Sequence, residues 1–261
     1  MFVWVVVSLK FKLPQQVSSV TLFDIKYSNV CLNEQKLFFK TWQSWIKTTS
    51  NDINARTSIF NSFENGKGIS MFGISYKNLE ETTQLLTPFI LINNASLDIK
   101  EVSFLDAVNE IGAIYPQYDY FISSGRFVNR YFSDCEINEM LNIINKDIPI
   151  GSELTSINFY GLGGSVSDVN KFDTAFYYRE SSYILLLQSE FKDNLYKVYS
   201  DEWFYRNFKY IYSLTNGSYV NFPYNRLINY NFNYYGKNIF RLKCVKKKYD
   251  PLNVFTFTQG I

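Results

Sequence analysis

Apolar and polar residues alternate along several short stretches of the chain, as they do in strands that bury one face. This pattern predicts strands over residues 20–27, 55–63, 69–76, 154–160, 174–178 and 183–191. Residues 2–12 form a further short β-type segment that Pro14 ends, and they are expected to be a buried strand. Gly66-Lys-Gly68 joins two of the predicted strands, and a short glycine-containing connection of this kind indicates a β-hairpin.

Helical spacing of apolar residues, at intervals of three to four, occurs between the strands. It predicts helices over residues 33–48 and 194–214. Two capping boxes, in which a polar residue is followed three positions later by glutamate, predict the starts of two further helices. The two boxes are Asn78 with Glu81 and Ser133 with Glu136.

The order of these elements predicts an α+β fold, with a broad antiparallel sheet and helices packed on one face. Aromatic residues make up 19% of the chain, which also favours wide sheets over helix bundles. Tyrosine, asparagine and lysine become dense after Asn216. We therefore expect two parts, an α+β region over 1–215 and a C-terminal segment over 216–261.

The absence of certain residue types excludes several kinds of catalytic and metal-binding site. The chain has no histidine, which excludes Ser-His-Asp and Cys-His nucleophiles and histidine-bound zinc, so proton transfer would fall to Tyr, Asp, Glu, Lys or Cys. Cys31, Cys135 and Cys244 form no CxxC pair, which predicts reduced core thiols, a cytoplasmic location and no metal site. The net charge of +2 argues against a dedicated nucleic-acid binder, and no membrane span is expected.

Two motifs with familiar functional meanings are better explained structurally. Gly161-Leu-Gly-Gly164 has Val166 where a dinucleotide fingerprint needs glycine, and no phosphate-loop lysine follows. These glycines are instead expected to allow a close approach to a strand. Lys246-Lys-Lys248 is expected to be a solvated face or turn.

The last 45 residues or so carry a dense, ordered set of motifs. They include Gly217-Ser-Tyr-Val-Asn-Phe-Pro-Tyr224, then Tyr234-Tyr-Gly-Lys-Asn238, and finally Val245-Lys-Lys-Lys-Tyr-Asp-Pro-Leu-Asn-Val-Phe255. This segment closely resembles the C-terminal segment of berberine-bridge-enzyme-like FAD-linked oxidases. Upstream segments are similar to that family in the same order: Leu85-Leu-Thr-Pro88, Ser103-Phe-Leu-Asp-Ala-Val108, Ser123-Ser-Gly-Arg-Phe-Val128 and Thr174-Ala-Phe-Tyr-Tyr-Arg179.

The resemblance implies the C-terminal part of an enzyme that oxidises an alcohol, sugar or amine by hydride transfer to flavin N5, with O₂ as the expected acceptor. It covers essentially all of this chain but only the second half of the family's enzymes, whose first half binds FAD. It thus implies a substrate-binding region over 1–215, a segment over 216–261 that packs on the flavin domain, and weak or no FAD retention by this chain alone. Its implied partners are a small-molecule substrate and a separate FAD-binding chain, with neither nucleic acid nor membrane.

By resemblance, Tyr219 matches the family's catalytic base, and Asn221, Asn238 and Asn253 match positions near the flavin or its domain. A phenol titrates near pH 10, so a base at Tyr219 requires an environment that the flavin-binding half would complete. On a strand, Tyr219 and Asn221 would point to one side, while Val220 and Phe222 would pack on the other.

Four residues depart from the family's pattern: Tyr178 replaces a histidine, Phe222 a frequent tyrosine, Tyr224 an aspartate and Gly260 a serine. Two alternatives to an oxidase part therefore stay open. One is a truncated remnant without catalysis, and the other is an aromatic-lined module that binds sugars or peptides without flavin.

Overall fold

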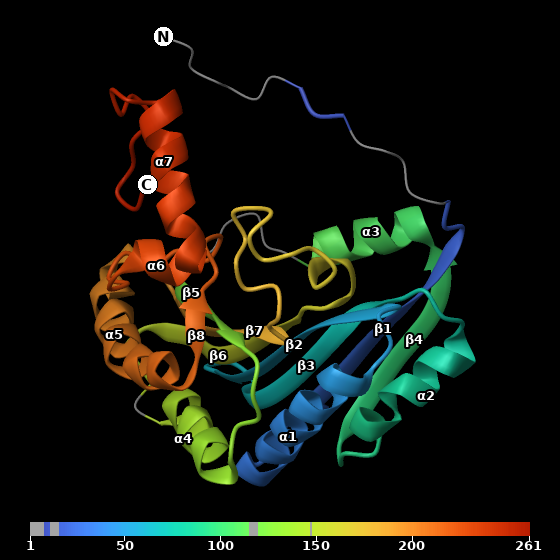
Figure 1. Cartoon of the computed structure of the whole chain (residues 1–261). Helices are drawn as coiled ribbons and strands as arrows, with labels where there is room; N and C mark the ends of the chain where they lie inside the picture. Colours follow the sequence, from blue (N-terminus) through green and yellow to red (C-terminus); the bar gives the residue numbers. More distant parts are fainter. Residues whose placement is uncertain (1–7, 11–15, 115–119, 147) are drawn as a thin grey trace.

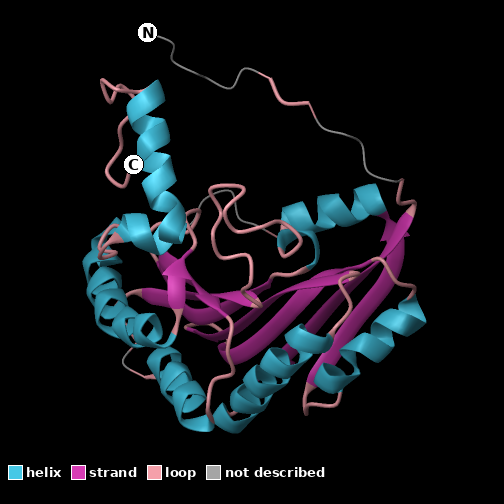
Figure 2. Ribbon diagram, in the orientation of Figure 1, coloured by secondary structure: helices cyan, strands magenta, loops and turns pink. Residues whose placement is uncertain are grey.

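The centre of the molecule is an eight-stranded sheet in which every pair of neighbouring strands is antiparallel (Figures 1 and 2). The computed structural model describes residues 8–10, 16–114, 120–146 and 148–261. The strand order is β4-β1-β3-β2-β6-β7-β5-β8. The strands are β1 (Ser19–Ser28), β2 (Ile53–Ser62), β3 (Gly66–Ser75), β4 (Ala95–Ser103), β5 (Phe121–Val128), β6 (Ser152–Gly161), β7 (Tyr183–Phe191) and β8 (Asn216–Ser218).

Four helices cover one face of the sheet, and a shorter one lies on the opposite face (Figure 1). The covering helices are α1 (Leu32–Thr48), α2 (Leu79–Ile90), α4 (Asp134–Asn145) and α5 (Lys197–Leu214). The helix on the opposite face is α3 (Phe104–Ala113), beside β1 and β4. After β8 come α6 (Tyr230–Tyr235) and α7 (Ile239–Tyr249), and α7 projects away from the sheet. Three 3₁₀ turns complete the elements: η1 (Gly164–Val166), η2 (Asn194–Tyr196) and η3 (Gly236–Asn238).

The predicted capping residues begin the helices as expected. At α4, Ser133 Oγ accepts the Glu136 N–H at 3.3 Å, and the Glu136 carboxylate accepts the Ser133 N–H at 2.7 Å. At α2, Asn78 Oδ1 accepts the Glu81 N–H at 2.9 Å. These bonds satisfy backbone donors that have no partner within the first turn of a helix.

The side-chain period of two separates the two faces of β1. Phe23, Ile25 and Tyr27 join the main core beneath the four helices, where Trp42 stacks on Phe159 with ring centroids 5.5 Å apart. Residues of the other parity, such as Val20, pack under α3 in a small second cluster. Beyond α3 none of the described helices covers this face of the sheet, and it is the face that carries the candidate site.

The α+β fold is confirmed, with two corrections. Helices lie on both faces, because α3 covers the end of the sheet at β1 and β4. The strand predicted over 174–178 is wrong: this segment lies in the loop between β6 and β7, where Tyr178 stacks on Phe127 at 4.5 Å. Its aromatic residues serve ring packing, not a strand ladder. The strand expected over 2–12 lies outside the described residues, apart from residues 8–10, which form no regular element.

The three cysteines are free thiols but are exposed, so the prediction of core positions is wrong. Cys31 precedes α1, Cys135 lies in the first turn of α4, and Cys244 lies on α7. All three positions belong to the solvent-facing part of a helix or its start. Within the described part of the chain, no helix combines the length and the apolar character needed to cross a bilayer.

Candidate functional site

The segment that carries Tyr219 is held against the middle of β5. The Tyr219 N–H donates to the Gly125 carbonyl at 2.9 Å, directly after the short strand β8. The chain then turns, because the Phe222 N–H donates back to the Tyr219 carbonyl at 3.0 Å. Ser124 Oγ reaches the Phe222 carbonyl at 3.5 Å and ties the far end of the turn to the same strand.

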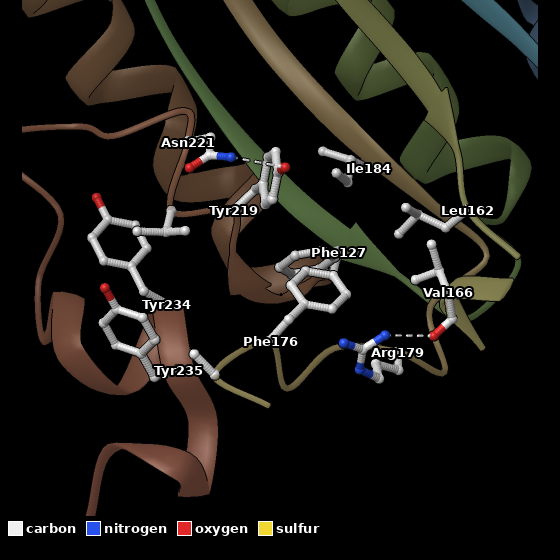
Figure 3. A pocket seen from close by; sticks show the side chains of 12 residues that line it. Phe127, Leu162, Val166, Phe176, Arg179, Ile184, Tyr219, Asn221, Tyr234 and Tyr235 are labelled. Carbon is white, nitrogen blue, oxygen red and sulfur yellow. Dashed lines mark hydrogen bonds between the residues drawn. The ribbon is translucent and has the colours of Figure 1, made fainter. Parts of the chain in front are cut away.

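Tyr219 and Asn221 come together, although not in the way that strand parity predicts. Asn221 Nδ2 donates to Tyr219 Oη at 3.0 Å (Figure 3). The expectation of a strand over 219–222 is wrong, because the segment is a turn. Val220 consequently lines the same cavity as its two neighbours and does not point to the opposite side. The amide occupies one lone pair of the phenol oxygen and fixes its orientation, which leaves the phenol proton available to another acceptor.

These side chains face a cavity of about 450 Å³ with largely apolar walls. Its lining residues are Phe127, Leu162, Val166, Ala175, Phe176, Arg179, Ile184, Tyr219, Val220, Asn221, Tyr234 and Tyr235. Phe127 lies edge-on to Tyr219, with ring centroids 6.0 Å apart. Such an aromatic wall suits a flat conjugated ring or the apolar part of a ligand.

Arg179 is held at the cavity by the loop that carries it. Its Nη1 donates to the Val166 carbonyl at 2.9 Å, and its Nη2 donates to Thr174 Oγ1 at 2.8 Å. Leu162, within the Gly161–Gly164 stretch, and Val166, just after it, line the same wall. Gly163 and Gly164 have φ angles of 141° and 49°, a region that favours glycine.

A second and larger space, of about 1200 Å³, lies over the face of the sheet that helices leave uncovered. Asn221 lines both this groove and the first cavity, so the Tyr219–Asn221 pair stands at their junction. The strand registers place rings beside polar groups on the groove floor: Phe72 is opposite Arg56, and Arg56 is opposite Tyr160. Further along the floor lie Ser58, Ser156, Asn158, Gln188 and Glu190. This mixture of rings and hydrogen-bonding groups is suited to polar organic molecules.

Asn238 and Asn253, the other two candidate residues, do not line either space. Asn238 is buried, and its Nδ2 donates to the carbonyls of Lys171 and Thr174 at 2.6 and 2.9 Å. It therefore anchors the loop that forms one wall of the first cavity. Asn253 is exposed, with a φ of 50° that turns the chain after α7.

The sequence analysis did not single out Arg126, the most deeply buried charged residue of this region, with 2% of its surface exposed. It lies on β5 and binds residues of α5, β8 and α6, all at least 86 positions later in the chain. The signal that marks it is a lone arginine between Gly125 and Phe127 in a strand with otherwise small or apolar residues.

Comparison with known proteins agrees with this architecture. The family "Berberine and berberine like" matches residues 218–261. The uncharacterized FAD-linked oxidoreductase YvdP of Bacillus subtilis is 27% identical over 254 residues, which cover 96% of this chain and 56% of YvdP. A chitooligosaccharide oxidase structure superposes with a TM-score of 0.79 at 20% identity, covering 94% of this chain and 55% of that one. Wild-type BBE-like 1 of Physcomitrella patens gives a TM-score of 0.79 at 21% identity, covering 94% and 54%.

The chain is thus similar to the berberine-bridge-enzyme-like FAD-linked oxidoreductases and matches their C-terminal portion. The two structures, at this level of identity, show that the fold is shared. The chain spans 56% of YvdP, about half the length of such a relative.

Proposed function

We propose that this chain is the substrate-binding part of an FAD-dependent oxidoreductase that oxidises an alcohol, sugar or amine, with O₂ as the electron acceptor. The observation that carries the proposal is the position of the Tyr219–Asn221 pair. It stands where an aromatic-walled cavity meets a polar groove. A reacting substrate carbon placed at that junction has a proton acceptor on one side and a binding surface on the other.

The residues around Tyr219 fit the edge of the flavin ring of FAD better than they fit its phosphate groups. Phe127, Phe176 and Tyr219 offer aromatic surfaces, and Asn221 offers an amide next to them. When bound, FAD supplies the hydride acceptor, its N5 atom. We assign Asn221 to direct contact with the cofactor, and Asn238 and Asn253 to the segments that meet the FAD-binding part.

Tyr219 is assigned as the general base. In the assembled enzyme Oη acts as the phenolate and takes the proton of the substrate hydroxyl or amine, while the Asn221 amide donates a hydrogen bond to this oxygen and keeps it turned toward the cavity. The groove holds the remainder of the substrate, because its serine, asparagine and glutamine side chains bind hydroxyl groups and its rings pack against apolar faces.

The partner that completes this site is an FAD-binding part, either on the same protein or as a separate chain. The C-terminal segment leaves large apolar side chains exposed: Phe240, Val245, Leu252, Val254 and Phe257. Clustered exposed apolar groups on a projecting element mark an interaction surface. We assign this surface, within the proposed segment 216–261, to contact with the FAD-binding part, and we place the assembled protein in the cytoplasm.

Co-expression with the part of YvdP that this chain does not match tests the proposal. The complex should bind FAD, and an alcohol, sugar or amine from a substrate panel should bleach the flavin absorbance under anaerobic conditions. This chain alone should purify with little or no flavin. A complex that binds FAD, but whose flavin no member of the panel reduces, would contradict an oxidase and favour a binding module or a non-catalytic remnant.

A further inference from the structure

A third cavity, of about 470 Å³, shares no lining residue with the Tyr219 cavity. It lies where β5 and β8 meet α5, α6 and the loop before β7. Arg126 lines it from within the protein, while Lys171 and Lys237 line it nearer the surface. The substrate groove does not include any of these three residues. The cavity is therefore separate from the proposed reaction site.

The guanidinium of Arg126 uses all five of its N–H donors within the protein. Nε donates to Thr215 Oγ1 at 3.0 Å, and Nη1 donates to Ser218 Oγ at 2.9 Å and to Asn233 Oδ1 at 2.7 Å. Nη2 donates to the carbonyls of Thr215 and Tyr212 at 3.0 and 3.5 Å. The Tyr212 ring covers the cation, with its centroid 4.1 Å away. Every one of these acceptors is neutral.

The positive charge of Arg126 is consequently not balanced by a carboxylate. None of the ion pairs formed between described residues includes Arg126. Burial lowers its pKa to about 10, so the side chain remains a cation at neutral pH. Buried charges in proteins are as a rule paired with an opposite charge or bound to a metal. The adjoining cavity is thus a favourable place for an anion.

The other charged residues of the cavity add to this excess of positive charge. Glu180 is the one acidic residue of its lining, and it is paired with Lys171 at 2.8 Å. Lys237 is exposed at the rim and takes part in no ion pair with a described residue. One buried and one rim cation therefore remain without a carboxylate.

Close packing gives this cavity rigid walls. Gly217 and Gly236 have φ angles of 59° and 50°, and a Cβ added to either would lie 2.0 or 2.3 Å from the ring of Tyr178 or Tyr177. The Tyr178 hydroxyl donates to the Phe232 carbonyl at 3.1 Å, which fixes that ring. The cavity is formed in advance and does not have to open for a ligand.

We propose that this cavity binds a small oxyanion, a phosphate or a carboxylate group. Arg126 attracts the anion through its charge, since its donors are already used. Hydrogen bonds come from the Lys237 ammonium and from the amides of Asn129 and Asn216, which also line the space. The proposal does not depend on the oxidase function, because this chain alone contains every group that it names.

Titration of the purified chain with inorganic phosphate, and separately with acetate, tests the site. Sodium chloride keeps the ionic strength constant, and binding is followed by calorimetry and by thermal unfolding. We expect saturable binding of at least one anion with an upward shift in the unfolding temperature. Binding of phosphate alone would identify a phosphate site, and binding of acetate alone would identify a carboxylate site.

Two variants separate this site from general attraction to a basic protein. Lys237→Gln removes the rim cation and should weaken binding about two- to five-fold, the usual effect of one exposed charge. Lys243→Gln removes the same charge from α7, outside the cavity, and should leave binding unchanged. The proposal is overturned if neither anion binds saturably, or if the two variants bind the anion equally well.

Discussion

Gly217→Ala should destabilise the protein much more than a typical glycine substitution. Gly217 has a φ of 59°, and an added Cβ would lie 2.0 Å from Cζ and 2.4 Å from Oη of Tyr178. The left-handed backbone costs an alanine about 1–2 kcal/mol. Displacing the Tyr178 ring also costs its stacking on Phe127, worth about 0.5–1.5 kcal/mol, and its hydrogen bond to Phe232, worth a similar amount. The total is a loss of about 2–5 kcal/mol.

Urea unfolding of the purified chain measures this loss, provided that the m-value stays constant. Gly66→Ala is the matched control, because Gly66 has a φ of 64° and a Cβ there meets no atom within 4 Å. It should cost only the backbone component, about 1–2 kcal/mol. If Gly217→Ala is no more destabilising than Gly66→Ala, the packing of Tyr178 against the backbone contributes nothing to stability.

Two further substitutions test local parts of the structure. The Arg130 guanidinium and a backbone N–H lower the pKa of Glu136 from 4.5 to about 2, so their stabilisation is complete above about pH 5 and disappears toward pH 2. Glu136→Gln should flatten the fall in unfolding free energy over that range, and an unchanged slope would refute the coupling. Asn238→Ala removes two hydrogen bonds, to the carbonyls of Lys171 and Thr174, each worth about 0.5–1.5 kcal/mol, and should cost about 1–3 kcal/mol. It should also speed proteolytic cleavage of the loop before β7, and unaltered cleavage would contradict the anchoring role.

Elements with strong local signals could be predicted from the sequence. Residues 183–191 form β7 with the predicted bounds, and Ser133 with Glu136 forms the capping box at α4. The alternation of Ala95, Leu97 and Ile99 with polar residues also marks β4, although this strand was not predicted. Periodicity in the sequence can therefore predict a strand or helix that pairs or packs along its whole length.

Features set by distant contacts could not be obtained in this way. Thr174–Tyr178 has the composition of a strand, but its rings pack on β5 and on the glycines that surround α6. Arg126 receives its acceptors from residues 86 to 107 positions away, which no local pattern encodes. The candidate pair Tyr219 and Asn221 came from a family resemblance, and only the structure shows the turn that joins them.

The rate of flavin reduction in the complex with an FAD-binding part tests the central claim most directly. Tyr219→Phe removes the proton acceptor and keeps the ring, so it should lower the rate of anaerobic flavin reduction about 10²- to 10⁴-fold while substrate still binds. Tyr199→Phe, on the exposed side of α5, removes the same hydroxyl group from a residue that lines neither the cavity nor the groove, and it should leave the rate unchanged. Flavin reduction at the parent rate in the Tyr219→Phe complex would contradict the assignment of Tyr219 as the base.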